Sequence, residues 1–130
     1  MGKPCVLIVE PELPVRHPVA EYLRECGYQV MEAVNTDEAV TLLACTENID
    51  VVLASVGSPG SLDAFSLSRW AQEKNHRAKV ILAGTHEKVT QHAAQLCEQG
   101  PMLARPYHHQ QLHDEIKRLL AAHKRSNDEE

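Results

Sequence analysis

The sequence predicts one α/β domain in which a parallel sheet lies between two layers of helices. Residues 6–9 read VLIV and residues 49–54 read IDVVLA, so both runs are apolar at nearly every position. Such runs are typical of parallel strands, which are buried on both faces. Segments with a helical spacing of apolar residues separate the runs, and parallel strands need a crossover of this kind. A length of 130 residues fits a single domain.

Predicted strands and helices alternate along the whole chain. We expect strands at residues 6–9, 28–34, 49–54, 79–83 and 101–104, and helices at residues 15–26, 36–47, 63–75, 89–97 and 112–120. Right-handed crossovers between five parallel strands favour the flavodoxin-like order 2-1-3-4-5. The predicted fold class is therefore a three-layer (βα)5 sandwich over residues 4–123. Residues 124–130 contain no apolar side chain and are expected to form a disordered tail.

Polar residues at the ends of the predicted helices support these bounds. Asn35 offers an N-cap to the second helix, and Asp63 offers one to the third. Gly27 suits the position that follows the first helix. Pro18 is tolerated only in a first turn or at a kink. Asp50 begins the third strand, where we expect it to serve strand entry.

Charge and hydropathy exclude two classes of protein. The chain carries 13 Lys and Arg residues against 18 Asp and Glu residues, for a net charge of -5. Nucleic-acid binding needs clustered basic residues, so no nucleic acid is expected as a partner. No apolar run reaches the length of a membrane span, and no secretory leader opens the sequence. We therefore expect a cytoplasmic protein with no membrane partner.

The cysteines form no close pair. They are Cys5, Cys26, Cys45 and Cys97. Zinc sites and small disulfide scaffolds usually show closer or denser cysteines. Each of the four lies in or beside an apolar segment, so we expect small core residues in a reducing compartment.

Three histidines gather around the start of the last predicted helix: His108, His109 and His113. His109 and His113 have the i, i+4 spacing that can hold zinc. The glutamate of such motifs and an obvious third ligand are both missing from the sequence pattern. A solvated helix face is therefore our interpretation, and a metal site is the alternative.

A parallel sheet of this order places a functional site at the carboxyl ends of its strands. The residues at those ends are Glu10, Pro11, Glu12, residues 55–57, Gly84, Thr85 and Arg105. The loop after the first strand is acidic and stiff, and it carries no glycine-rich phosphate motif. A dinucleotide or flavin site is therefore not expected.

Four segments that include these positions, VLIVEPE, IDVVLASVGSPGSLDAF, KVILAGTH and MLARPY, resemble the receiver domain of two-component response regulators. The resemblance covers residues 4–123 and implies the sandwich predicted above. It also implies a protein that takes a phosphoryl group from a histidine kinase onto an Asp at the end of the third strand. In that family an acidic pair after the first strand holds Mg²⁺.

Two of the carboxylates that the resemblance implies are replaced in this chain. The acidic pair falls on Glu10 and Pro11, with Glu12 adjacent, and the acceptor position falls on Ser55. A serine hydroxyl needs a base to act as a nucleophile, and none is evident nearby in the sequence. We therefore expect a degenerate pseudo-receiver without a cofactor. Mg²⁺ binding should be weak or absent, with Glu10 and Glu12 as weak candidates for metal ligands.

The other family positions are retained only in part. The switch hydroxyl falls on Gly84, with Thr85 one residue later, and the aromatic switch position falls on Met102. The family's lysine is replaced by Arg105, whereas Pro106 keeps the family's proline. The sequence leaves the isomer of the 105–106 peptide bond open.

The resemblance implies a signalling role without enzymatic activity. We expect a protein partner, either a histidine kinase or a downstream effector, and the sequence leaves a homodimer open. Met102, Tyr107 and His108 lie on the surface that the family uses for signalling.

Two other functions compete with this interpretation. One is a small enzyme or ligand-binding module that uses the remodelled pocket; its residues would be Glu10, Glu12, Ser55, Thr85 and Arg105. The other is a receiver that still takes phosphate, on Ser55 or elsewhere.

Overall fold

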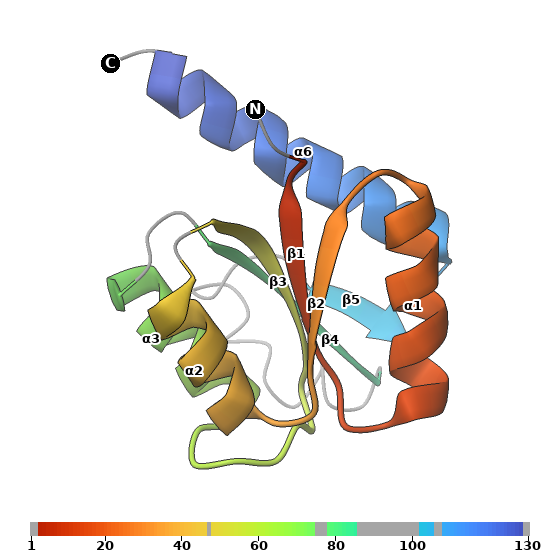
Figure 1. The fold of residues 1–130 in the computed structure, drawn as a ribbon, viewed down its shortest axis with the longest axis vertical. Helices are drawn as coiled ribbons and strands as arrows, with labels where there is room; N and C mark the ends of the chain where they lie inside the picture. Colours follow the sequence, from red (N-terminus) through yellow and green to blue (C-terminus); the bar gives the residue numbers. More distant parts are fainter. Residues whose placement is uncertain (1–2, 47, 75–77, 86–101, 106–107, 129–130) are drawn as a thin grey trace.

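The computed structural model describes residues 3–46, 48–74, 78–85, 102–105 and 108–128, with the backbone alone for residues 85, 102–105 and 122–128. Figure 1 shows a sheet with helices on both sides. The elements are β1 (Cys5–Val9), α1 (Leu13–Glu25), β2 (Gln29–Ala33), α2 (Thr36–Cys45), β3 (Ile49–Ser55), α3 (Ala64–Lys74), β4 (Lys79–Thr85), β5 (Met102–Arg105) and α6 (His109–Asp128). The predicted helix around residues 89–97 lies outside the described residues.

The sheet confirms the predicted fold class. Its five strands have the order β2-β1-β3-β4-β5, and every neighbouring pair is parallel. β1 and β3 lie side by side in the middle of the sheet, which is where the strand order changes direction. The carboxyl ends of these two strands therefore flank the position where an open α/β sheet holds its functional site.

Both faces of the sheet are buried, because successive residues of a strand point to opposite sides. On β1, Cys5, Leu7 and Val9 belong to the core shared with α2 and α3, whereas Val6 and Ile8 belong to the core shared with α1 and α6. Figure 1 shows the two helix pairs on opposite sides of the sheet. Over the described residues, no helix combines the length and the apolar character needed to cross a membrane.

Asp50 stabilises an irregularity at the amino end of the sheet. Cys5 pairs with Ile49 and Val6 pairs with Val51, so the register between β1 and β3 skips Asp50. The buried Asp50 carboxylate accepts the backbone N–H of Cys5 at 2.9 Å. Burial raises the pKa of the Cys5 thiol, and the negative charge of Asp50 adds to the rise. Asp50 thus serves strand entry.

The helix ends agree with most of the predicted signals. The Asn35 side chain accepts the N–H of Glu38 at 2.8 Å, and the Asp63 side chain accepts the N–H of Ser66 at 2.7 Å. Both contacts are side-chain caps. Pro18 lies inside α1 at an exposed position. Proline has no backbone N–H, so one helical hydrogen bond is missing there, on the side of α1 that faces water.

Two expectations differ from the structure. α6 continues through Asp128, so residues 124–128 extend the helix where a tail was expected; residues 109–128 contain no Gly or Pro that would end it. The expectation of core cysteines holds for Cys5 but is wrong for Cys45, which is exposed, and Cys26 is only half-buried. Cys97 lies outside the described residues.

The loop between β3 and α3 is attached to the start of α2. The N–H of Thr36 donates to the carbonyl of Pro59 at 2.9 Å, and the Thr36 hydroxyl donates to the carbonyl of Leu62 at 2.7 Å. The Asp37 carboxylate accepts the N–H of Ser61 at 3.2 Å. Gly60 allows this close approach, because its φ is +135° and a Cβ there would lie 2.0 Å from the Thr36 hydroxyl oxygen.

Gly60→Ala should therefore destabilise the protein by about 1–3 kcal/mol, through backbone strain together with the collision at Thr36. Gly27→Ala is the matched control, because Gly27 has a φ of +99° but a Cβ added there would meet no atom within 4 Å. Urea unfolding of both variants should give the larger loss for Gly60→Ala. Equal losses would mean that the contact with α2 contributes nothing beyond the strained backbone.

Candidate functional site

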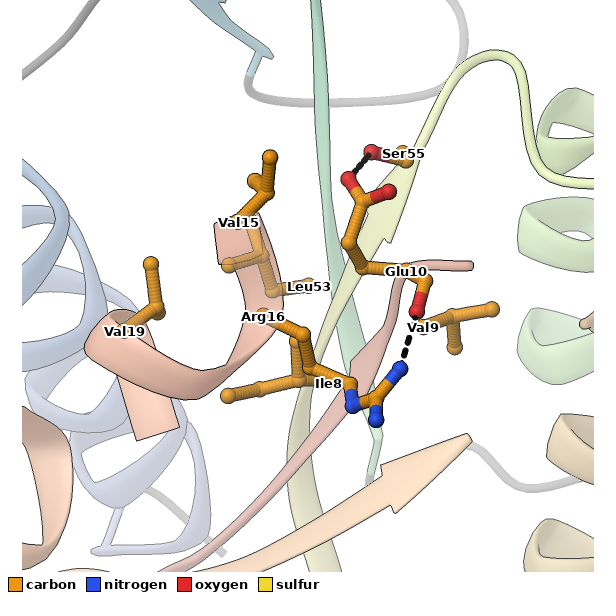
Figure 2. A pocket seen from close by; sticks show the side chains of 8 residues that line it. All are labelled: Ile8, Val9, Glu10, Val15, Arg16, Val19, Leu53 and Ser55. Carbon is orange, nitrogen blue, oxygen red and sulfur yellow. Dashed lines mark hydrogen bonds between the residues drawn. The ribbon is translucent and has the colours of Figure 1, made fainter. Parts of the chain in front are cut away.

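The two central strands bring Glu10 and Ser55 together at the carboxyl edge of the sheet. Glu10 follows β1 directly, and Ser55 is the last residue of β3. The Ser55 hydroxyl donates a hydrogen bond to Oε1 of Glu10 (Figure 2). Glu10 is 4% exposed and Ser55 is 5% exposed. The sequence predicted that both residues lie at this edge, and their contact crosses 45 positions of the chain.

The Glu10 carboxylate is held on both oxygens. While Oε1 accepts from Ser55, Oε2 accepts the backbone N–H of Glu12 at 3.0 Å. The backbone of Glu10 is held as well, because its N–H donates to Ala33 on β2 at 2.9 Å. Hydrogen bonds to a carboxylate of this kind offset the cost of burying it. The charge is therefore fixed in position rather than free to turn toward a ligand.

This contact also gives Ser55 a neighbouring base that the sequence did not reveal. A carboxylate that accepts the hydrogen bond of a hydroxyl stands where a general base would stand. The same hydrogen bond also fixes the positions of the two side chains at the edge of the sheet.

A small cavity lies beside the pair, between the sheet and the first turns of α1. It measures about 10 Å³, and its lining is mainly apolar; the lining residues are Ile8, Val9, Glu10, Val15, Arg16, Val19, Leu53 and Ser55 (Figure 2). A space of this size accommodates about one water molecule. It is far too small for a metabolite or a nucleotide.

Arg16 connects the site to the edge of the sheet. Its guanidinium donates to the carbonyl oxygen of Glu10 at 2.8 Å and to the carboxylate of Glu32 on β2 at 2.9 Å. Arg24 reaches the other oxygen of Glu32 at 3.1 Å. Burial alone would raise the pKa of Glu32, but the hydrogen bonds and charges of Arg16 and Arg24 outweigh it and hold the pKa below its usual value.

The remaining predicted site residues are distributed around the same edge. Pro11 and Glu12 are exposed, and Gly84 is buried near the end of β4. The backbones of Thr85 and Arg105 are partners in the pairing of β4 with β5, and Ser55 pairs with Ala83. The backbones of all these positions therefore lie along the carboxyl edge of the sheet.

The predicted signalling surface is described only in part. Met102 begins β5, and His108 is exposed directly before α6. Pro106 and Tyr107 lie outside the described residues.

Arg16 and Ser58 belong to the site but escaped the sequence prediction. Ser58 is buried, and its hydroxyl donates to the carbonyl of Val9 at 3.4 Å. In the sequence, Arg16 appears only as a basic residue in the first turns of a predicted helix. Ser58 appears only as a serine in a Gly- and Pro-rich loop. Both signals are common on protein surfaces, so neither could identify a site residue without the fold.

Comparison with known proteins points to one family of folds. No protein-family model matches the chain. The chain is 25% identical over 121 residues to the transcriptional regulatory protein AruR of Pseudomonas aeruginosa, which covers 90% of this chain and 49% of AruR. A signal receiver domain of a histidine kinase from Syntrophus aciditrophicus superposes with a TM-score of 0.80 at 27% identity, over 92% of this chain and 91% of that one.

A third similar protein, the response regulator TrrA of Thermotoga maritima, was solved in complex with Mg(2+)-BeF. It superposes with a TM-score of 0.78 at 22% identity, covering 89% of this chain and 98% of TrrA. The chain has the CheY-like receiver fold. This chain spans about half the length of AruR.

The described residues at this edge offer few of the ligands that a magnesium site uses. Mg²⁺ prefers several hard oxygen ligands in octahedral geometry, usually including carboxylates. Here Glu10 supplies a carboxylate whose two oxygens already accept hydrogen bonds, and Pro11 and Ser55 supply no carboxylate at all. The exposed Glu12 is the neighbouring acid, and its N–H is bonded to Glu10. These residues fit Mg²⁺ poorly.

Glu32→Gln should lower stability at neutral pH by about 1 kcal/mol, because two partly screened ion pairs are lost. The folded state lowers the pKa of Glu32 from its usual 4.5. Its contribution is therefore complete above the unfolded pKa and is lost as the pH falls through the folded pKa.

Urea unfolding of the two proteins should consequently show a gap at neutral pH that closes in strong acid. Glu21→Gln is the control, since Glu21 is 53% exposed and meets Arg24 at 3.4 Å only. A gap of equal size at both pH values would contradict the role given to the Glu32 charge.

Proposed function

We propose that this chain is a receiver-like domain of two-component signalling that acts through protein contacts and does not accept a phosphoryl group. The observation that carries the proposal is the buried hydrogen bond between Ser55 and Glu10. It occupies the edge where the resemblance places the acceptor carboxylate and its metal.

Electrostatics argue against phosphorylation at this position. A phosphoserine would bring close to two negative charges beside the buried Glu10 carboxylate. Like charges in a poorly solvated site repel, so a phosphoryl group beside Glu10 would need a cation to offset the repulsion. The poor fit of these residues to Mg²⁺ acts in the same direction.

Phosphorylation on Ser55 remains the second candidate, because Glu10 accepts the hydrogen bond of that hydroxyl. The ligand-binding alternative has less support. The cavity beside Glu10 and Ser55 is about 10 Å³, and enzymes that bind small molecules need pockets at least about thirty times larger. We therefore propose a protein without enzymatic activity.

The proposed partners are proteins of a signalling pathway, either a histidine kinase or a downstream effector, and a second copy of the chain is a further option. In this proposal the domain acts in the cytoplasm without binding nucleic acid or membrane. Recognition would involve the surface around β5 and the start of α6, where His108 is exposed.

The first test is intact-mass spectrometry after incubation with Mg²⁺ and a small acyl-phosphate donor. The wild-type chain should gain no phosphoryl mass, and Ser55→Ala should behave in the same way. A stoichiometric gain that Ser55→Ala abolishes would overturn the proposal and show a site rebuilt around a serine.

The second test restores the missing carboxylates. Pro11→Asp combined with Ser55→Asp adds two acids beside Glu10 and Glu12, so the variant should melt below the wild type in the absence of metal. Low-millimolar Mg²⁺ should raise the melting temperature of the variant by roughly 4 °C or more and leave the wild type unchanged.

Gln72→Asp adds one exposed acid on α3 and serves as the control for a general effect of charge. A clear rise for the wild-type protein, beyond that of Gln72→Asp, would mean that the natural site binds Mg²⁺.

A further inference from the structure

The loop that joins β3 to α3, residues 56–63, connects the candidate site with the start of α2. It leaves the sheet after Ser55, which donates to the Glu10 carboxylate. It then passes beside Thr36, the first residue of α2. Figure 1 shows the loop in yellow-green, running from the end of β3 past the start of α2. One short segment of chain therefore joins two places that lie on different elements.

The first half of this loop is held to the sheet. The N–H of Val56 donates to the carbonyl of Ala83 on β4 at 2.7 Å. The N–H of the buried Ser58 donates to the carbonyl of Ser55 at 3.1 Å. The hydroxyl of Ser58 makes a longer hydrogen bond, 3.4 Å, with the carbonyl of Val9 on β1. The position of Ser58 therefore depends on both central strands, at the edge where their carboxyl ends meet.

The second half of the loop is held to α2. Thr36 is fully buried, and its hydroxyl oxygen lies 2.7 Å from the carbonyl oxygen of Leu62 and 3.2 Å from that of Pro59. Pro59 follows Ser58 directly, and a proline restricts its own backbone and that of the residue before it. The chain between the two anchored halves is therefore stiff, and a movement of one half is passed to the other.

We propose that residues 56–63 form a coupling loop, through which the start of α2 and the Glu10–Ser55 pair open and close together. Buried polar groups lose their partners at either end if the loop moves, and leaving such groups unpaired is costly. Because the loop is short and stiff, opening one end strains the bonds at the other end. Coupling of this kind is reciprocal, so whatever holds one end closed also holds the other end closed.

A role in signalling would follow from this coupling. A protein contact at the start of α2 would alter the edge at Glu10 and Ser55 without any phosphoryl group. That use rests on the proposed function, whereas the coupling itself does not. Hydrogen exchange measures the coupling alone, so its result is independent of the result of the phosphorylation test.

Hydrogen exchange of single amides, followed by NMR on the whole chain, tests the coupling. Thr36→Val removes the hydroxyl and keeps the shape of the side chain, so it weakens the α2 anchor. The amides of Val56 and Ser58, in the half of the loop that is held to the sheet, should then exchange at least about tenfold faster. Conversely, Ser55→Ala should speed exchange of the Thr36 amide by a similar factor.

Two controls separate the coupling from a general loss of stability. Thr41→Val makes the same substitution at an exposed position of α2, and it should leave exchange at Val56 and Ser58 unchanged. The amide of Cys5 donates to a carboxylate at the opposite end of the sheet, and in Thr36→Val it should exchange at the wild-type rate.

Asp37→Ala replaces Thr36→Val if the latter does not fold, because the exposed Asp37 carboxylate accepts the N–H of Ser61 in the same loop. It should accelerate exchange in the same places. The coupling is absent if the acceleration in each variant is confined to the half of the loop beside the substitution. It is equally absent if the Cys5 amide accelerates by the same factor as the loop.

Discussion

The parallel pairing of β1 with β3 is the constraint on which the rest of the molecule depends. Both strands are buried on their two faces, so their backbone groups must pair with neighbouring strands, and most of their side chains are apolar. The pairing places the ends of the two strands side by side, and Glu10 and Ser55 meet there. At the opposite end the register of the same pair skips Asp50, whose carboxylate accepts the N–H of Cys5.

A buried acid with no partner would be costly in such a place, and the surroundings of Glu10 reduce that cost. Ser55 and the N–H of Glu12 hold its carboxylate, while Arg16 holds its carbonyl oxygen and joins Glu32 on the edge strand. The site is therefore continuous with the ion pairs that fasten α1 to β2. A substitution at Glu10 would therefore disturb the packing of α1 as well as the edge of the sheet.

The sequence predicted the strands, most helix ends and the strand order, because these depend on local periodicity and on the general handedness of crossovers. It also predicted which residues gather at the carboxyl edge, including Glu10 and Ser55. It could not predict the roles of Arg16 and Ser58, or the contact of Cys26 with His113, because these depend on the rotation and crossing of packed helices. The helical end at Asp128 also differed, since polar composition alone does not end a helix that lacks Gly and Pro.

The attachment of the β3–α3 loop to α2 has a consequence for how this protein resists proteases. By composition, the segment from Gly57 to Ser61 resembles an exposed linker, which proteases cut readily. Cleavage requires several residues to leave the surface and enter an active site in extended form. Here Thr36 and Asp37 hold the backbone at Pro59, Ser61 and Leu62, so cutting must wait for those bonds to open together. A stretch that looks like a weak point is thus protected by the helix beside it.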